Sequence, residues 1–261
     1  MIILPIGDDQ VKGGSFPIFS YVFIAINILV FILLQLPSDE FTMAYSVIPM
    51  EITSGQDFVK SMTVMLDGQA ITQQHQPGPV PIYLTLISNI FMHGGWMHLI
   101  GNMIFLWVFA DNIESTVGSP RFVLFYVLGG VIASLAHIAS DPASITPSLG
   151  ASGAIAACLG AYLVMFPKSK VKVLVFITII SVPAFLFLGF WIVQQYLGVI
   201  GSGEGVAWWA HIGGLVFGVI VGFYFKEMYP KVIKDEEDFM PIRRPSRRYN
   251  NREITRSKFF K

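Results

Sequence analysis

The stretch Gly150-Ala151-Ser152-Gly153-Ala154-Ile155-Ala156-Ala157-Cys158-Leu159-Gly160 begins an apolar run that continues to Phe166. Most of its residues are small, so the backbone of another helix can approach it closely, as is typical of helix contacts inside membranes. Ser152 is the hydroxyl near its start. A lone serine in a membrane helix is usually a packing residue, whereas a serine beside a base is an activated nucleophile. The polar residues at the same membrane depth therefore decide its role.

The composition of the chain is that of a polytopic membrane protein. Of its 261 residues, 54% are hydrophobic and 13% are charged, about half the charge of a soluble domain. Six apolar segments are long enough, or nearly long enough, to cross a bilayer: 16–36, 95–113, 122–139, 149–166, 171–200 and 206–225. We expect an all-α bundle of six transmembrane helices, with a kink at Pro183 in the fifth.

The segments outside these spans predict the domain organisation. A membrane domain is expected at 16–226, between an N-terminal segment, 1–15, and a polar, basic, mobile tail, 227–261. The first two helices are joined by a long loop, 37–94, whose apolar stretches 58–66 and 83–91 are expected in the membrane interface. Basic residues beside a span usually report topology, so the tail predicts no nucleic-acid binding.

Lysine and arginine predict the orientation of the chain. With six spans, all but one of the 17 basic residues lie on the side of the two termini, and the exception is Lys60 in the long loop. We therefore expect a multi-pass protein of the cell membrane with both termini cytoplasmic and the long loop outside.

Polar side chains on three helices fall at one depth in the outer leaflet. At 1.5 Å per residue, Ser152 and His98 lie roughly 5 Å below the outer surface. His211 lies roughly 8 Å below it and Asn102 roughly 10 Å. Such groups are costly in a membrane unless they face one another or water. A shared polar pocket that opens to the outer side is expected.

Small residues provide the contact that would close this pocket. Gly214, Gly218 and Gly222 repeat every four residues in the last span, and Gly153, Ala157 and Ala161 repeat at the same period in the fourth. Two such stripes allow close helix approach, which would bring Ser152 and His211 within hydrogen-bond reach.

These residues suit acyl-transfer chemistry. Histidine can remove the proton of a hydroxyl near neutral pH, and an oxyanion needs donors. Asn102, His98 and the backbone N–H of Ser152 can supply them. No Asp or Glu lies in the outer half of a span, so we expect a Ser152–His211 dyad whose imidazole is oriented by packing.

Other uses of the histidines are weaker. His93, His98 and His211 form a conceivable metal or haem set, but His-Glu-x-x-His is absent and no carboxylate accompanies them at depth. No metal or cofactor is predicted. His137 is given no role, His75 is expected to be exposed, and Cys158 is expected to be buried.

Three motifs, in this order, resemble the bacterial rhomboid proteases over most of 16–226. They are His93-Gly94-Gly95-Trp96-Met97-His98-Leu99-Ile100-Gly101-Asn102, Gly150-Ala151-Ser152-Gly153 and Ala210-His211-Ile212-Gly213-Gly214. The segment 111–114, with Gly118 and Arg121, is similar to the inner loop of that family.

The resemblance implies a role for each matched residue. Ser152 would be the nucleophile, His211 the general base, and His98 and Asn102 the oxyanion residues. His93 would be structural, and we expect the same of Gly150, Gly153, Gly214 and Gly218.

The implied activity is hydrolysis of a peptide bond near the outer end of a transmembrane helix, through an acyl-enzyme. Access would be lateral, with the fifth helix and the outer loop as the gate. The implied partners are membrane-protein substrates and the lipid bilayer, and the oligomeric state is left open.

The chain departs from the family pattern at two places. Many members have Trp-Arg where this chain has Leu84-Thr85, so the outer loop is expected to anchor differently. Some stack an aromatic residue, here Ala156, on the catalytic histidine, so His211 needs another packing partner.

Two other functions remain alternatives. A non-catalytic rhomboid-like protein would bind membrane helices, but it usually loses the Ser or the His, and this chain keeps both. A transporter would need ionisable residues in the inner half of its spans, and none is seen there.

Overall fold

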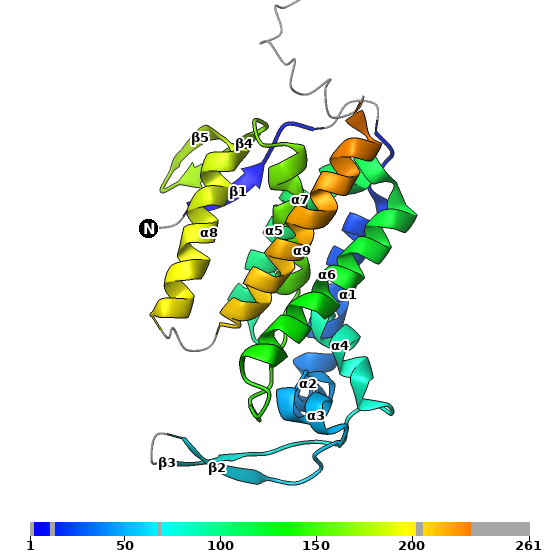
Figure 1. The fold of residues 1–261 in the computed structure, drawn as a ribbon, viewed down its shortest axis with the longest axis vertical. Coiled ribbons are helices and arrows are strands. Elements are labelled where there is room, and N and C mark those ends of the chain that lie inside the picture. Colours follow the sequence, from blue (N-terminus) through cyan, green and yellow to red (C-terminus); the bar gives the residue numbers. More distant parts are fainter. Residues whose placement is uncertain (1–2, 11–13, 67–68, 202–205, 231–261) are drawn as a thin grey trace, which may run out of the picture.

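The computed structural model describes residues 3–10, 14–66, 69–201 and 206–230. The described part is mostly helical (Figure 1). Its longer helices form a bundle: α1 Ile18–Val30, extended by the π-helix η1 Phe31–Gln35, α5 Trp96–Val117, α6 Ser119–Ser140, α7 Ser152–Met165, α8 Ala184–Ile200 and α9 Trp208–Met228. Most of the tail expected at 227–261 and Lys12 lie outside the described residues.

The two small-residue stripes meet, as the sequence predicted. Gly214 lies against the carbonyl oxygen of Gly153, and Gly218 lies against that of Ala157. A Cβ on Gly222 would lie 2.8 Å from the Cα of Ala161. A side chain at these positions would separate α7 from α9, because backbone atoms fill the space.

The fifth apolar segment is not one kinked helix, which corrects the sequence-based expectation. Residues 171–183 belong to a β-hairpin, β4 Lys170–Val175 and β5 Thr178–Pro183, and only 184–200 form a helix. The hairpin is rich in β-branched residues, which favour strands. In the N-terminal segment, β1 Ile3–Gly7 pairs antiparallel with β4, giving a sheet of order β1-β4-β5. Pro183 ends β5 at the start of α8.

The long loop folds into a cap at the opposite end of the bundle from this sheet (Figure 1). It contains the helices α2 Asp39–Tyr45 and α3 Pro49–Ser54 and the hairpin β2 Met62–Leu66 and β3 Gln69–Gln73. Three short helical turns follow: η2 Ile82–Leu84, α4 Thr85–Ser88 and η3 Asn89–Phe91. The stretch 58–66 thus includes a strand, and 83–91 is helical.

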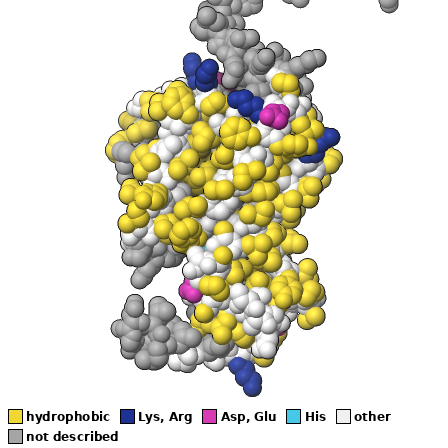
Figure 2. Space-filling model, viewed as in Figure 1, with side chains coloured by type: hydrophobic (Ala, Val, Ile, Leu, Met, Phe, Trp, Pro, Cys, Tyr) yellow, Lys and Arg dark blue, Asp and Glu magenta, His cyan; other side chains and the backbone are white. Residues whose placement is uncertain are grey.

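The surface of the bundle fits a membrane environment. Among the described residues, 18–35, α6 and α9 are long and apolar enough to cross a bilayer. Figure 2 shows hydrophobic side chains across the middle of the molecule. Lys and Arg side chains gather at the end that carries the β1-β4-β5 sheet, and one projects from the end with the cap.

A buried carboxylate caps the N-terminal end of α1. Glu114, near the end of α5, is fully buried and accepts hydrogen bonds from the backbone N–H groups of Phe19 (2.9 Å) and Ser20 (2.7 Å). The hydroxyl of Ser119, the first residue of α6, also donates to it, at 2.5 Å. N–H groups in the first turn of a helix have no intrahelical acceptor, so Glu114 satisfies donors that α1 cannot.

We predict that Glu114→Ala destabilises the fold by about 1–3 kcal/mol for each buried donor that it leaves unpaired. The melting temperature of the purified protein in detergent should fall by several degrees. Glu227→Ala is the matched control, because Glu227 is exposed near the end of α9. Equal melting temperatures for the two variants would contradict the capping role.

A second carboxyl, Asp8, is buried where the chain leaves β1. It accepts hydrogen bonds from the hydroxyl of Tyr162 (2.5 Å), the amide of Asn112 (2.7 Å) and the amide of Gln10 (3.0 Å). Gln10 also donates to Asp111, so a second carboxyl lies close to that of Asp8. Burial, and then the charge of Asp111, raise the pKa of Asp8 to about 8.

This shift predicts how stability depends on pH. The folded protein keeps the Asp8 proton up to about pH 8, whereas the unfolded chain loses it near pH 4. Stability should therefore fall as the pH rises between these values. Melting scans from pH 5 to 9 should show a shallower decline for Asp8→Asn, which stays uncharged. The exposed Asp141→Asn should keep the wild-type slope, and an equally steep decline in Asp8→Asn would refute the assignment.

A serine and histidine pair at the wall of a polar cavity

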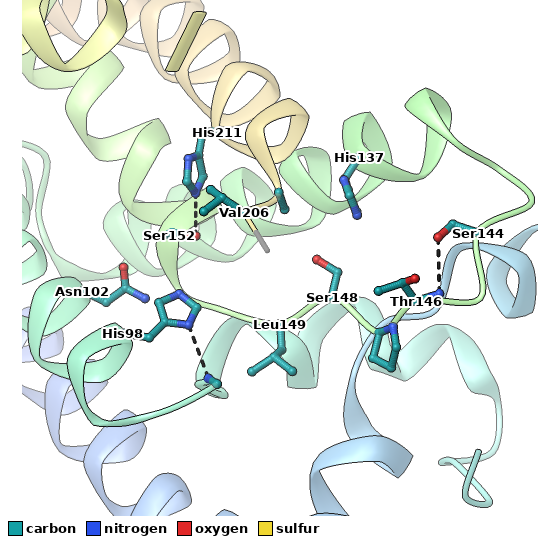
Figure 3. Close-up of a pocket in the computed structure, with 13 residues that line it drawn as sticks. His98, Asn102, His137, Ser144, Thr146, Ser148, Leu149, Ser152, Val206 and His211 are labelled. Atoms are coloured by element: carbon teal, nitrogen blue, oxygen red, sulfur yellow. Dashed lines mark hydrogen bonds between the residues drawn. The ribbon is translucent and has the colours of Figure 1, made fainter. Parts of the chain in front are cut away.

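Ser152 and His211 come together where α7 and α9 begin. Ser152 is the first residue of α7, and His211 lies in the first turn of α9. The Oγ of Ser152 and the Nε2 of His211 are 2.8 Å apart (Figure 3). The glycine contacts between the two helices lie directly below this pair, so helix packing sets the distance.

The cap holds the segment that leads into Ser152. Val47 and Ser148 form an isolated β-bridge through two backbone hydrogen bonds of 2.8 and 3.0 Å. The N–H of Gly150 donates to the carbonyl of Asn89 at 2.9 Å. The side chain of Asn89 contacts the hydroxyl of Ser134 on α6 at 3.3 Å. The cap is thus anchored through Asn89, in the turn that follows Leu84-Thr85.

The expected oxyanion donors line the same cavity as Ser152. Asn102 is buried, and its Nδ2 has no hydrogen-bond partner. The Nδ1 of His98 accepts the N–H of Gly94 at 3.3 Å, so the proton of a neutral ring lies on Nε2. As the first residue of α7, Ser152 has a backbone N–H without an intrahelical acceptor. Donors from two helices therefore surround the hydroxyl.

The cavity has a volume of about 710 Å³ and is lined by polar groups around Ser152. A smaller space of about 210 Å³ lies on the side of α5 and α8. Its lining includes the apolar residues Met97, Phe105, Ile155, Leu159 and Trp191. The two spaces share His98, Asn102, Ser152 and His211, so the serine hydroxyl lies where a polar space meets a more apolar one.

The other histidines are placed differently. His93 is buried behind His98, with ring centres 5.2 Å apart, and burial lowers the pKa of His93 to about 3. Its backbone makes two hydrogen bonds to the side chain of Gln35. His137 lines the far side of the cavity (Figure 3). His75, expected to be exposed, is only 4% exposed and packs on Phe58 in the cap.

Sequence analysis missed one polar neighbour of His211. The Oε1 of Gln195, on α8, lies 2.6 Å from the Nδ1 of His211. Both ring nitrogens of His211 are therefore engaged in hydrogen bonds to side chains of other helices. The position of Gln195 in the sequence was a signal, because this amide lies five residues from the C-terminal end of the fifth apolar segment. Packing alone does not orient the imidazole, contrary to expectation.

Two tryptophans take the place of the aromatic residue that is absent at Ala156. The rings of Trp191, on α8, and Trp208, on α9, have centres 6.0 and 6.1 Å from that of His211. The packing partners of the histidine thus come from its own helix and from α8.

The fold and this site define a helical protein of membrane type with a serine–histidine pair at a polar cavity. A family model, the rhomboid domain, matches residues 82–228. The chain belongs to the rhomboid family.

Individual relatives include proteases and rhomboid-like proteins. Rhomboid protease GluP of Bacillus subtilis is 31% identical over 205 residues, which are 77% of this chain and 34% of GluP. Presenilin-associated rhomboid-like protein A, a mitochondrial protein of Danio rerio, is 32% identical over 138 residues, 52% of this chain and 36% of its own. The mitochondrial Rhomboid protein 1 of Saccharomyces cerevisiae is 29% identical over 160 residues, which are 57% of this chain and 43% of the yeast protein. The matches thus span between about a third and two fifths of these relatives.

We predict that Gly150→Ala disables the site. Gly150 has φ +143°, which disfavours other residues, and an added Cβ would lie 2.9 Å from the His98 ring. Labelling of Ser152 by a fluorophosphonate probe should fall at least tenfold. Gly189→Ala on α8 is the control, because no atom lies within 4 Å of its added Cβ. Wild-type labelling of Gly150→Ala would show that the site tolerates the side chain.

Proposed function

We propose that the chain is an intramembrane serine endopeptidase in which Ser152 is the nucleophile and His211 the general base. The observation that carries the proposal is the 2.8 Å contact between Oγ of Ser152 and Nε2 of His211 at the cavity wall. A hydroxyl becomes a strong nucleophile only beside a base. A positioned general base contributes about 10²–10⁴ in rate.

In the first half of the reaction, Oγ of Ser152 attacks the carbonyl carbon of the scissile peptide and its proton passes to Nε2 of His211. The carbonyl oxygen becomes an oxyanion, which accepts hydrogen bonds from Asn102, His98 and the N–H of Ser152. The C–N bond then breaks, and the leaving amine takes the proton from His211. The product is an acyl-enzyme on Ser152.

In the second half, water enters through the polar cavity. The water oxygen attacks the acyl carbon while His211 takes one of the water protons. Asn102, His98 and the N–H of Ser152 donate hydrogen bonds to the second oxyanion. The tetrahedral intermediate then collapses. The bond between the acyl carbon and Oγ of Ser152 breaks, and Oγ recovers the proton from His211. The carboxylic product leaves and the free serine is restored.

The apolar surface around the site supports a transmembrane helix as the substrate. We propose that α1, α5, α6, α7, α8 and α9 cross the bilayer as one domain, 16–226, with both termini cytoplasmic and the cavity open outward. Basic residues at the end with the β1-β4-β5 sheet support this orientation. The apolar space between α5 and α8 would admit a substrate helix laterally near its outer end. We propose that this bilayer is the cell membrane, as for a bacterial rhomboid.

The test is cleavage of a single-span reporter by the purified protein in liposomes. Wild type should cleave it, and Ser152→Ala should reduce the rate by at least 10³-fold. Ser140→Ala, at the end of α6, is a serine control that should leave the rate unchanged. Equal cleavage by wild type and Ser152→Ala would refute Ser152 as the nucleophile. Folded protein that neither cleaves nor reacts with a serine probe would favour the non-catalytic alternative, a binder of membrane helices.

A further inference from the structure

Gln195 contacts the histidine of the site from a helix that carries neither member of the pair. Its Oε1 lies 2.6 Å from Nδ1 of His211, and its Nε2 donates to the carbonyl of Trp191 at 3.1 Å. The side chain is only 6% exposed. Both ends of the amide are therefore engaged within the protein.

These two contacts determine which ring nitrogen carries the proton. The amide nitrogen can only donate and the amide oxygen can only accept. Because Nε2 of Gln195 is used on a backbone carbonyl, its oxygen must face His211. The Nδ1 of His211 must then carry the proton, which leaves Nε2 of the ring free to accept from Ser152.

The alternative arrangements are unfavourable. A flipped amide would place its oxygen against the carbonyl oxygen of Trp191. The other tautomer of the ring would place two acceptors face to face, Nδ1 and Oε1 of Gln195. It would also turn an N–H toward Ser152, and a protonated nitrogen cannot take the proton of the serine hydroxyl.

We propose that Gln195 is a positioning residue, which holds His211 in the tautomer and orientation that a general base for Ser152 requires. The inference rests on the proposed function, and it assigns to a neutral amide the orienting role that a carboxylate has in a triad. Trp191, one turn earlier on the same helix, packs on the same ring. One face of α8 therefore sets both the position and the protonation site of the imidazole.

Because Gln195 lies on α8, the orientation of His211 as a general base depends on how α8 packs against the rest of the bundle. Ser152 and His211 are held by the backbone contacts between α7 and α9. Near its outer end, α8 approaches α9 at Gly198, where an added Cβ would collide with the ring of Trp208. Its opposite face exposes large apolar side chains, among them Phe190 and Tyr196. A displacement of α8 would remove Gln195 from His211 while the serine–histidine distance is kept.

The kinetic test compares Gln195→Leu and Gln195→Met with Gln194→Leu in the whole chain. Leu and Met fill a similar volume without an amide oxygen, and Gln194 is the exposed neighbour on the same helix. We expect kcat for reporter cleavage to fall about 10²-fold, within the range of a positioned base, with KM changed less than threefold. Gln194→Leu should match wild type. Values of kcat within twofold of wild type in a folded Gln195 variant would overturn the proposal.

Gln195→Glu tests the chemistry of the contact. A carboxylate also accepts from Nδ1 but loses the bond to the carbonyl of Trp191, so kcat at alkaline pH should recover in part, to a value above that of Gln195→Leu. Because its charge stabilises the protonated ring, the acidic limb of the pH–rate profile should move to higher pH. A limb at the wild-type position, with kcat as low as in Gln195→Leu, would show that Gln195 does not act through His211.

A spectroscopic readout separates this inference from the proposed function. In protein labelled with ¹⁵N-histidine, the wild-type spectrum should contain a ring protonated at Nδ1 that is absent in His211→Ala. In Gln195→Leu that signal should shift toward the other tautomer or average with it. An unchanged signal would overturn the inference even if the protein cleaves. The expected change in a protein that does not cleave would support the positioning while refuting the protease.

Discussion

The close approach of the α7 and α9 backbones is the contact on which the rest of the site depends. Inside a bilayer the lipid is as apolar as a helix surface, so helices associate through van der Waals contact and hydrogen bonds. Gly214 and Gly218 allow the carbonyls of α7 to touch α9 directly. Because Ser152 and His211 both lie in the first turn of these helices, the same contact brings the hydroxyl to the imidazole. Stability and the geometry of the site therefore share one cause.

Polar networks at the two ends of the bundle complete what glycine packing begins. At the end that carries the β1-β4-β5 sheet, Glu114 joins the starts of α1 and α6, and Asp8 joins β1 to α5 and α7. At the opposite end, the cap holds the segment before Ser152 through Asn89. In the described part of the chain, these networks lie near the ends of the helices rather than in the apolar middle of the bundle, which suits a region without water. Precise polar geometry is concentrated where the helices begin and end.

The helix α8 differs from this pattern. A β-hairpin precedes it, so strand pairing with β1 holds its N-terminal end. It reaches the site through Trp191 and Gln195. Lateral access between α5 and α8 and orientation of the base would thus involve the same element. The apolar space beside Ser152 and the amide on His211 are two consequences of where α8 lies.

The sequence by itself determined the small-residue stripes and the positions of Ser152, His211, His98 and Asn102 along their helices, because residue spacing converts directly into height along a helix. It also indicated the family, through three motifs in order. Only the tertiary structure decided that 171–183 pairs as strands, since an apolar run of β-branched residues suits a buried helix or a strand until its partner β1 is known. It likewise decided that Gln195 contacts His211. Height along one helix can be read from the sequence, whereas the direction in which a side chain points depends on how that helix is rotated against its neighbours.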